Sequence, residues 1–244
     1  MKLTPQQQAM LLQKLHGVPD EKIANLAILL LIVISCVLLV ITVISKTWFM
    51  LLLPITGFLI AGGYSYRIAT ISNPTIENYR YMYMLLIVPA LLLAVVNYKC
   101  IGKITNNKLL IISFIIIDIL CLFIQIYGVT YLTEIDPTKI HTGLNYIMAG
   151  LIFAIIVNII FIGLVIKIQN SLNFPREFWI CIYVTMILLL LRNIYKLVEF
   201  IQSRRSKNGQ GYLSNHELYM YLFDFSIIFV ALVIFAVLHY GFYL

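Results

Sequence analysis

The chain has 244 residues, of which 62% are hydrophobic and 11% charged, and its mean hydropathy is +0.97. Soluble domains are nearer to half apolar, so this composition excludes a soluble globular protein and indicates a polytopic membrane protein. The net charge is +7, but the basic residues lie mostly at the ends of apolar runs, where they meet lipid headgroups. Nucleic-acid binding is therefore not expected.

The N-terminal segment, residues 1–22, is polar but carries helix signals. Thr4 and Gln7 form a capping box, and Gly17 supplies a stop after a short stripe of apolar residues. We expect a short helix lying on the membrane surface. The membrane domain is predicted to cover residues 23–241.

Seven apolar runs follow, each long enough to cross about 30 Å of hydrocarbon. They lie near residues 23–45, 49–69, 80–99, 109–130, 143–167, 178–201 and 217–240. Every backbone polar group in lipid needs an internal partner, and the runs are too long and too uniformly apolar for barrel strands. The predicted fold class is therefore all-α, a bundle of seven transmembrane helices.

Proline and small residues predict the shape and packing of these helices. Pro54 and Pro89 fall within the second and third runs and are expected to bend or locally open them. Pairs of small residues are expected to let helices approach closely. These pairs are Gly57 with Ala61, Gly62 with Gly63, Ala90 with Ala94, and Gly150 with Ala154.

Charged residues interrupt the last two runs. Arg192, Lys196 and Glu199 recur at steps of four and three, so they share one helix face. The last run repeats this spacing with Glu217, Tyr221 and Asp224. A charge at the bilayer centre costs on the order of 3 kcal/mol, so charges there are normally paired or turned toward a polar cavity. Arg192 is expected to neutralise Asp224, and Lys196 to neutralise Glu199. The cluster is then either a structural lock or also a contact for a substrate or a proton.

The depth of the polar residues predicts a chamber inside the bundle. We call the membrane face that carries the N-terminus and the loops after the second, fourth and sixth runs the first face. Asp118 and Asn158 fall near the midplane, and the other polar residues fall between the midplane and the first face. The second, fourth, sixth and seventh helices are expected to converge on one chamber open to that face. The candidate residues of the substrate pathway or polar core are Tyr64, Arg67, Asp118, Gln125, Arg192, Lys196, Glu199, Glu217, Tyr221 and Asp224.

Several chemistries lack their sequence signals. Residues 217–240 contain no lysine for a retinal Schiff base, and no T-V-G-Y-G filter is present. The four histidines and four cysteines are scattered without metal-ligand spacing, and no glycine loop for phosphate exists. No nucleophile and base lie at supportive spacing. We expect no metal, no cofactor and no enzymatic activity.

The last third of the chain resembles the fungal RTA-like family, which comprises seven-helix membrane proteins also called lipid-translocating exporters. The resemblance rests first on R-N-I-Y-K-L-V-E-F at 192–200 and H-E-L-Y-M-Y-L-F-D at 216–224. Other matching segments occur in the same order: G-Y-S-Y-R at 63–67, P-A-L-L-L-A-V-V-N-Y at 89–98 and D-I-L-C-L-F-I-Q-I-Y-G at 118–128. The chain departs from the family pattern at Lys196, where arginine is usual, and at Ala154, where glutamine is common.

The resemblance also implies an orientation in the plasma membrane, with an extracellular N-terminus and a cytoplasmic C-terminus. The distribution of basic residues points weakly the other way, because more of them lie at the first face. Most of that excess comes from R-R-S-K at 204–207, which resembles an insertion, within a loop expected to start at Ser203. We therefore follow the family orientation.

The resemblance implies export or translocation of sphingoid long-chain bases or sterol-like amines, and resistance to toxic amphiphiles. Glu199, Glu217 and Asp224 would then meet the amine, while Arg67 and Arg192 hold them ionised. The alternative is a seven-helix sensor for such lipids that regulates other transporters. The expected partners are membrane lipids and an amphipathic lipid substrate, with no nucleic acid, and the sequence leaves protein partners open.

Overall fold

The computed structural model describes residues 21–132, 134, 137–172, 174–205 and 212–243. The described chain is helical apart from short connections and contains no strand. Seven of its helices are long and apolar enough to cross a membrane, which confirms the predicted all-α bundle. The surface helix predicted between Thr4 and Gly17 lies outside the described residues.

The helices follow the chain in the predicted order. The first six crossings are α2 (Glu21–Ile44), η1 with α3 (Trp48–Leu51 and Leu52–Ser72), α4 (Ile76–Thr105), α5 (Lys108–Leu132), α6 (Pro137–Gln169) and α7 (Arg176–Arg205). A short helix, α8 (Tyr212–Asn215), precedes the seventh crossing, which consists of α9 (Glu217–Met220), η2 (Tyr221–Phe225), α10 (Ser226–Val237) and η3 (Tyr240–Phe242). The expectation that a loop begins at Ser203 is wrong, because α7 continues to Arg205.

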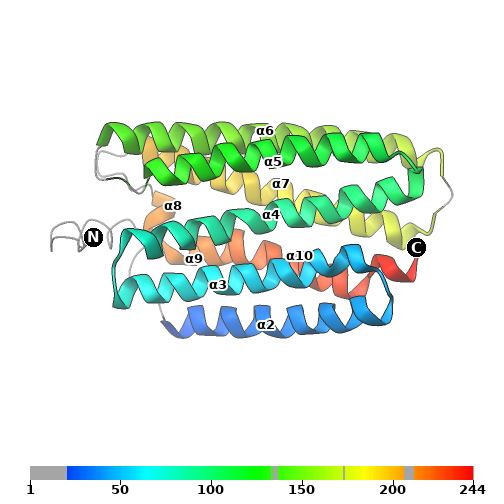
Figure 1. Ribbon diagram of the computed structural model, residues 1–244, viewed down its shortest axis with the longest axis horizontal. Helices are drawn as coiled ribbons and strands as arrows, with labels where there is room; N and C mark the ends of the chain where they lie inside the picture. Colours follow the sequence, from blue (N-terminus) through cyan, green and yellow to red (C-terminus); the bar gives the residue numbers. More distant parts are fainter. Residues whose placement is uncertain (1–20, 133, 135–136, 173, 206–211, 244) are drawn as a thin grey trace.

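The crossings lie side by side along the long axis of the molecule (Figure 1). In this view α2 and α3 form one side, α5 and α6 form the opposite side, and α4 runs between them with α7 and α10 behind it. The first face holds the start of α2, the α3 to α4 and α5 to α6 connections, and α8 with α9. The second face holds the end of the chain at η3.

The outside of the bundle is apolar and its interior contains charge. Exposed positions on the outer helices are large hydrophobic residues such as Val40 on α2 and Phe123 on α5. By contrast Arg67, Glu199 and Asp224 are buried. This distribution is typical of a protein whose solvent is hydrocarbon, where ionisable groups face the bundle interior and pair with one another.

Glycines set the closest helix contacts. A side chain at Gly57 on α3 would collide with Oγ of Ser35 on α2, as the small-residue pattern predicted. A further close contact was not predicted: a Cβ at Gly128 on α5 would lie 2.7 Å from the carbonyl oxygen of Gly143 on α6. The backbones of α5 and α6 therefore touch near the first face.

The two prolines differ in effect. Pro89 lies inside α4, where its missing N–H leaves the carbonyl of Leu85 without its helical donor. Pro54 was expected to bend or locally open the second helix. It lies in the first turn of α3, directly after η1. A proline there costs little, because an N–H in the first turn has no helical acceptor.

Candidate functional site

Three charged residues join α7 to the seventh crossing. Nε of Arg192 donates to Oδ1 of Asp224 at 2.6 Å, and Nζ of Lys196 lies 2.9 Å from Oδ2 of the same carboxylate. Lys196 also pairs with Glu199 one turn along α7, at 3.1 Å. All four side chains are almost fully buried. The two pairings expected from helical spacing are confirmed, and Asp224 additionally bridges Arg192 and Lys196.

Arg67 forms a second charged link, between α3 and α9. One terminal nitrogen lies 3.2 Å from Oε1 of Glu217, and the other donates to the thioether sulfur of Met220 at 2.6 Å. Arg67 is completely buried. Thioether sulfur is a weak acceptor for a guanidinium N–H. The sequence identified Arg67 and Glu217 as candidates but did not indicate that they would pair.

Two candidate tyrosines pack beside this link. The rings of Tyr64 and Tyr221 stack with their centroids 5.7 Å apart, and the guanidinium of Arg67 lies over the Tyr221 ring at 5.7 Å. Cation–π contacts of this kind favour Arg over an uncharged residue. Tyr221 thus packs against Arg67, and Tyr64 packs against Tyr221.

The seventh crossing contains a π-helical turn at Asp224. In η2, Tyr221–Phe225, the carbonyl of Tyr221 accepts from both the backbone N–H and the hydroxyl of Ser226 five residues on. Single π-turns inside α-helices occur frequently at functional sites. The extra residue in the turn changes the direction in which Asp224 points relative to the rest of α10. Helical spacing alone could not reveal it.

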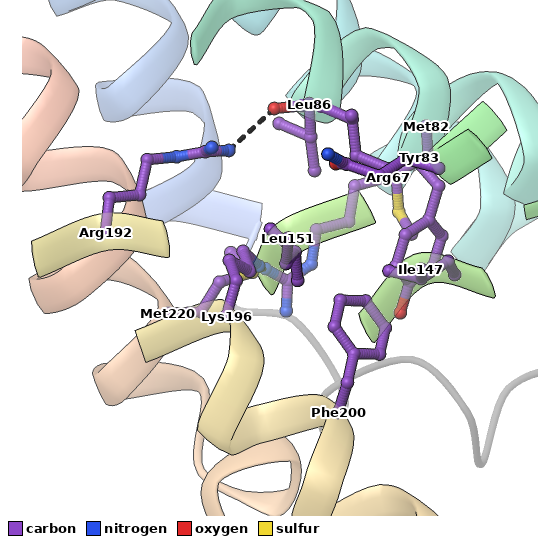
Figure 2. A pocket seen from close by; sticks show the side chains of 12 residues that line it. Arg67, Met82, Tyr83, Leu86, Ile147, Leu151, Arg192, Lys196, Phe200 and Met220 are labelled. Carbon is purple, nitrogen blue, oxygen red and sulfur yellow. Dashed lines mark hydrogen bonds between the residues drawn. The ribbon is translucent and has the colours of Figure 1, made fainter. Parts of the chain in front are cut away.

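Arg192 also binds α4. Its second terminal nitrogen donates to the backbone carbonyl of Leu86 at 2.7 Å, drawn as the dashed line in Figure 2. This carbonyl follows directly after that of Leu85, which Pro89 leaves without a helical donor. Arg192 therefore holds three elements together, α4, α7 and η2.

A first cavity opens beside these cations, with about 20 Å³ available to the centre of a water molecule. That is room for roughly one or two waters. It is lined by Arg67, Met82, Tyr83, Leu86, Ile87, Gln125, Ile147, Leu151, Arg192, Lys196, Phe200 and Met220. Figure 2 shows Arg192, Arg67 and Lys196 around the same space, with Phe200, Ile147 and Tyr83 across from them.

A second cavity of about 40 Å³ by the same measure lies deeper in the bundle. Its polar lining comes from Asp118, Gln125, Asn158, Arg192 and Asn193. The hydroxyl of Tyr98 donates to Oδ2 of Asp118 at 2.7 Å. Oδ1 of Asn158 is buried and has no hydrogen-bond partner among the described residues. Gln125, Arg192 and Ile87 line both cavities, so the two spaces adjoin.

A sequence model described as "RTA1 like protein" matches residues 53–244, most of the chain. The chain belongs to the RTA1-like protein family. Similar proteins from Saccharomyces cerevisiae include Protoporphyrin uptake protein 1, which is 31% identical over 67% of this chain and 59% of the relative. Protein RTA1 is 27% identical over 72% of this chain and 60% of the relative. Protein RTM1 is 26% identical over 63% of this chain and 54% of the relative.

The RTA1-like chain therefore spans somewhat more than half the length of the curated relatives it matches. No solved structure matches it. The matched range begins within α3, so α2 precedes it.

In this RTA1-like chain the polar chamber differs from the expected one in two respects. The structure has two adjoining cavities in place of one chamber, and α4 and α6 line them as well as α3, α5, α7 and α9. The first cavity is lined by the cations of the cluster, Arg67, Arg192 and Lys196. The acids Glu199, Glu217 and Asp224 are not among its lining residues; each pairs with a cation.

Several residues around the RTA1-like cavities escaped the sequence-based prediction. Met220, Tyr83 and Phe200 line the first cavity, but Met and aromatic residues are so common in apolar runs that nothing marks them. Asn193 lines the second cavity and follows Arg192 directly, so an interruption of two polar residues could have indicated it. A polar contact near the second face was also missed: Tyr240 donates to Oδ1 of Asn97 at 2.7 Å.

Proposed function

We propose that the protein translocates amphipathic molecules across the membrane in which it is embedded, with lipids such as sphingoid bases or sterol-like amines among the candidate substrates. The observation that carries the proposal is the pair of adjoining, polar-lined cavities inside the seven-helix bundle. An amphiphile crosses a bilayer slowly because its polar head group must leave water, and a polar route inside a protein removes that cost.

The lining of the first cavity suits a molecule with a polar head and an apolar body. Its polar contacts come from three cations and Gln125, and the rest of the lining is apolar or aromatic. Binding sites for small molecules commonly combine an apolar lining with a few polar groups that fix orientation. One relative is named for the uptake of protoporphyrin, which is itself amphipathic.

The cavities are narrow, so translocation requires the helices around them to separate. The groups that would part are the ion pairs and hydrogen bonds between α3, α4, α7 and the seventh crossing. An amine substrate would additionally have to draw Glu199, Glu217 or Asp224 away from its cation. The proposal involves no covalent chemistry, and we propose that the protein is not an enzyme.

Reconstitution tests the proposal. The purified protein in liposomes should accelerate the movement of a fluorescent amphiphile between leaflets. This movement is measured by adding dithionite, which quenches only the fluorophores in the outer leaflet. The panel should include a sphingoid base, a sterol amine, a porphyrin and a single-chain carboxylic acid. Binding of a panel member without any movement in liposomes would overturn translocation in favour of a sensor. Chemical conversion of a panel member, seen by mass spectrometry, would reveal an enzyme.

We also propose a plasma-membrane location with the start of α2 on the extracellular side. With an odd number of crossings, seven, the start of α2 and the end of η3 would lie on opposite sides of the membrane. Tags placed before α2 and after η3 in intact cells test the orientation. Labelling of the first tag alone by an impermeant antibody supports it, and labelling of the second tag alone reverses it.

A further inference from the structure

We propose that the first cavity binds the acidic head group of an amphiphile, a carboxylate or a phosphate. This inference rests on the proposed handling of amphiphiles and specifies their charge. It runs against the amine substrate that the family resemblance implies. The lining residues that carry charge are Arg67, Arg192 and Lys196, all cations.

The geometry of the cluster orients positive charge toward the cavity. Asp224 neutralises Arg192 and Lys196 from the side of η2, and Glu217 meets Arg67 from α9. None of these carboxylates lines the space. The cluster is balanced overall, with three cations and three acids in the pairs described, but the cations are nearer to a ligand than the acids. In a poorly solvated interior that difference in distance favours an anion over a cation.

Arg67 makes one of its hydrogen bonds to a weak acceptor. One of its terminal nitrogens donates to the thioether of Met220, which accepts weakly. A carboxylate or phosphate oxygen is a far stronger acceptor for guanidinium and forms short, charge-assisted hydrogen bonds with it. A ligand oxygen that replaced the sulfur would leave the Glu217 pair in place, because that pair uses the other terminal nitrogen.

The apolar lining accounts for the rest of the ligand. Ile147 on α6 and Phe200 on α7 lie across the cavity from Arg192 and Lys196 (Figure 2), and Leu151 on α6 also lines it. They offer no hydrogen-bond donor or acceptor in their side chains, so they suit hydrocarbon. The existing space holds only water-sized groups, so the head group would displace water and the apolar body would separate these side chains.

Equilibrium binding to the full chain in phosphatidylcholine nanodiscs, with empty nanodiscs as the baseline, tests the charge of the head group. The probes are radiolabelled palmitate, lysophosphatidate, sphingosine and hexadecanol at pH 8. We expect saturable binding of palmitate or lysophosphatidate and weaker binding of sphingosine and hexadecanol. A preference for palmitate identifies the head group as carboxylate, and a preference for lysophosphatidate identifies it as phosphate. Tighter binding of sphingosine than of both acids would overturn the proposal.

Variants that remove a cation and a variant that removes an acid should change binding in opposite directions, which distinguishes contact with the ligand from a structural role. Arg67→Gln and Lys196→Gln should weaken binding of the acid on the order of tenfold, since each removes one charge-assisted contact. Glu217→Gln should tighten it, because it removes a negative charge 3.2 Å from the Arg67 guanidinium and so leaves more positive charge for the acid. Lys103→Gln is the matched control, since Lys103 carries the same charge but lies beside Phe49, outside the cavity.

If a variant that lacks one of the cations fails to fold, acid binding by Glu217→Gln still tests the proposal. Weaker binding of the acid in Glu217→Gln, with an unchanged elution profile, would overturn the proposal. Failure of the head-group inference is distinguishable from failure of translocation. Sphingosine that binds best and moves in liposomes would refute only the former, and an acid that binds but does not move would refute only the latter.

Discussion

The carboxylate of Asp224 accepts a hydrogen bond of 2.6 Å from Nε of Arg192, and this contact joins the π-helical turn of the seventh crossing to the middle of α7. The same guanidinium donates to α4 through the carbonyl of Leu86. Arg192 and Asp224 are both buried, so this ion pair, with the bond to Leu86, forms a fixed connection between three crossings. Both cavities lie against it, since Arg192 lines each of them.

Breaking this pair on one side should destabilise the bundle. Asp224→Asn leaves Arg192 and Lys196 buried beside a neutral amide, and loss of one partner of a buried pair costs about 3–5 kcal/mol. We expect a lower melting temperature of the detergent-purified protein, measured by fluorescence-detected size exclusion after heating. Asp224→Asn combined with Arg192→Gln should recover much of the loss, because Lys196 still pairs with Glu199. A double variant as unstable as the sum of the single variants would show that the two residues are not coupled.

Adding a side chain at Gly128 should separate α5 from α6. The new Cβ of Gly128→Ala would lie 2.7 Å from the carbonyl oxygen of Gly143 and 2.9 Å from the backbone nitrogen of Ile147, and backbone atoms cannot move aside as a flexible side chain can. Overpacking of this kind costs about 1–3 kcal/mol. The matched control is Gly163→Ala on α6, where a Cβ meets nothing within 4 Å. Gly163→Ala should leave stability unchanged or raise it by up to about 1 kcal/mol, because alanine favours helix. Equal losses in the two variants would refute the contact.

The hydrogen bond between Tyr240 in η3 and Asn97 in α4 should stabilise the C-terminal turn. Tyr240→Phe removes the donor to Oδ1 of Asn97 and should lower the free energy of unfolding by about 1 kcal/mol. The same substitution in an Asn97→Leu background should cost less, since the acceptor is already gone. Tyr243→Phe on the adjacent turn, where the ring contacts Phe178, serves as the control. Identical costs of Tyr240→Phe in both backgrounds would show that the bond contributes nothing.

Filling the first cavity should stop translocation without altering its charges. Leu151 is buried and lines the space, so Leu151→Trp would occupy the volume that an amphiphile needs. We expect the movement of labelled amphiphile in liposomes to fall to the level of empty liposomes. Ile152→Trp is the control, because Ile152 is 46% exposed on the outer surface of the same helix. Normal transport by a well-folded Leu151→Trp protein would place the route elsewhere.

Helical spacing predicted much of the charged cluster correctly. Arg192, Lys196 and Glu199 recur at steps of four and three, so one helix face had to carry them whatever the tertiary fold. The high cost of unpaired charge in hydrocarbon then required acidic partners, and Asp224 was the residue of the next crossing at a comparable depth. Both expected pairs are present. The place of Pro54 within its helix could not be predicted in this way, because it depends on where the α-helix begins, and α3 begins only after η1.

The sequence by itself determined the number of crossings, their order and the burial of the charges. Hydrocarbon permits only helices and closed barrels, the runs are too long and too uniformly apolar for barrel strands, and unpaired ions are excluded. The tertiary structure alone decided which charges face the cavities. Arg67 meets Glu217 and Met220 across the bundle, and the π-helical turn at Asp224 directs its carboxylate to the cations of α7. Packing sets these directions in three dimensions, and residue spacing along one helix carries no information about the rotation of its neighbours. The first cavity therefore presents Arg67, Arg192 and Lys196, where the family resemblance had implied that Glu199, Glu217 and Asp224 would meet a substrate.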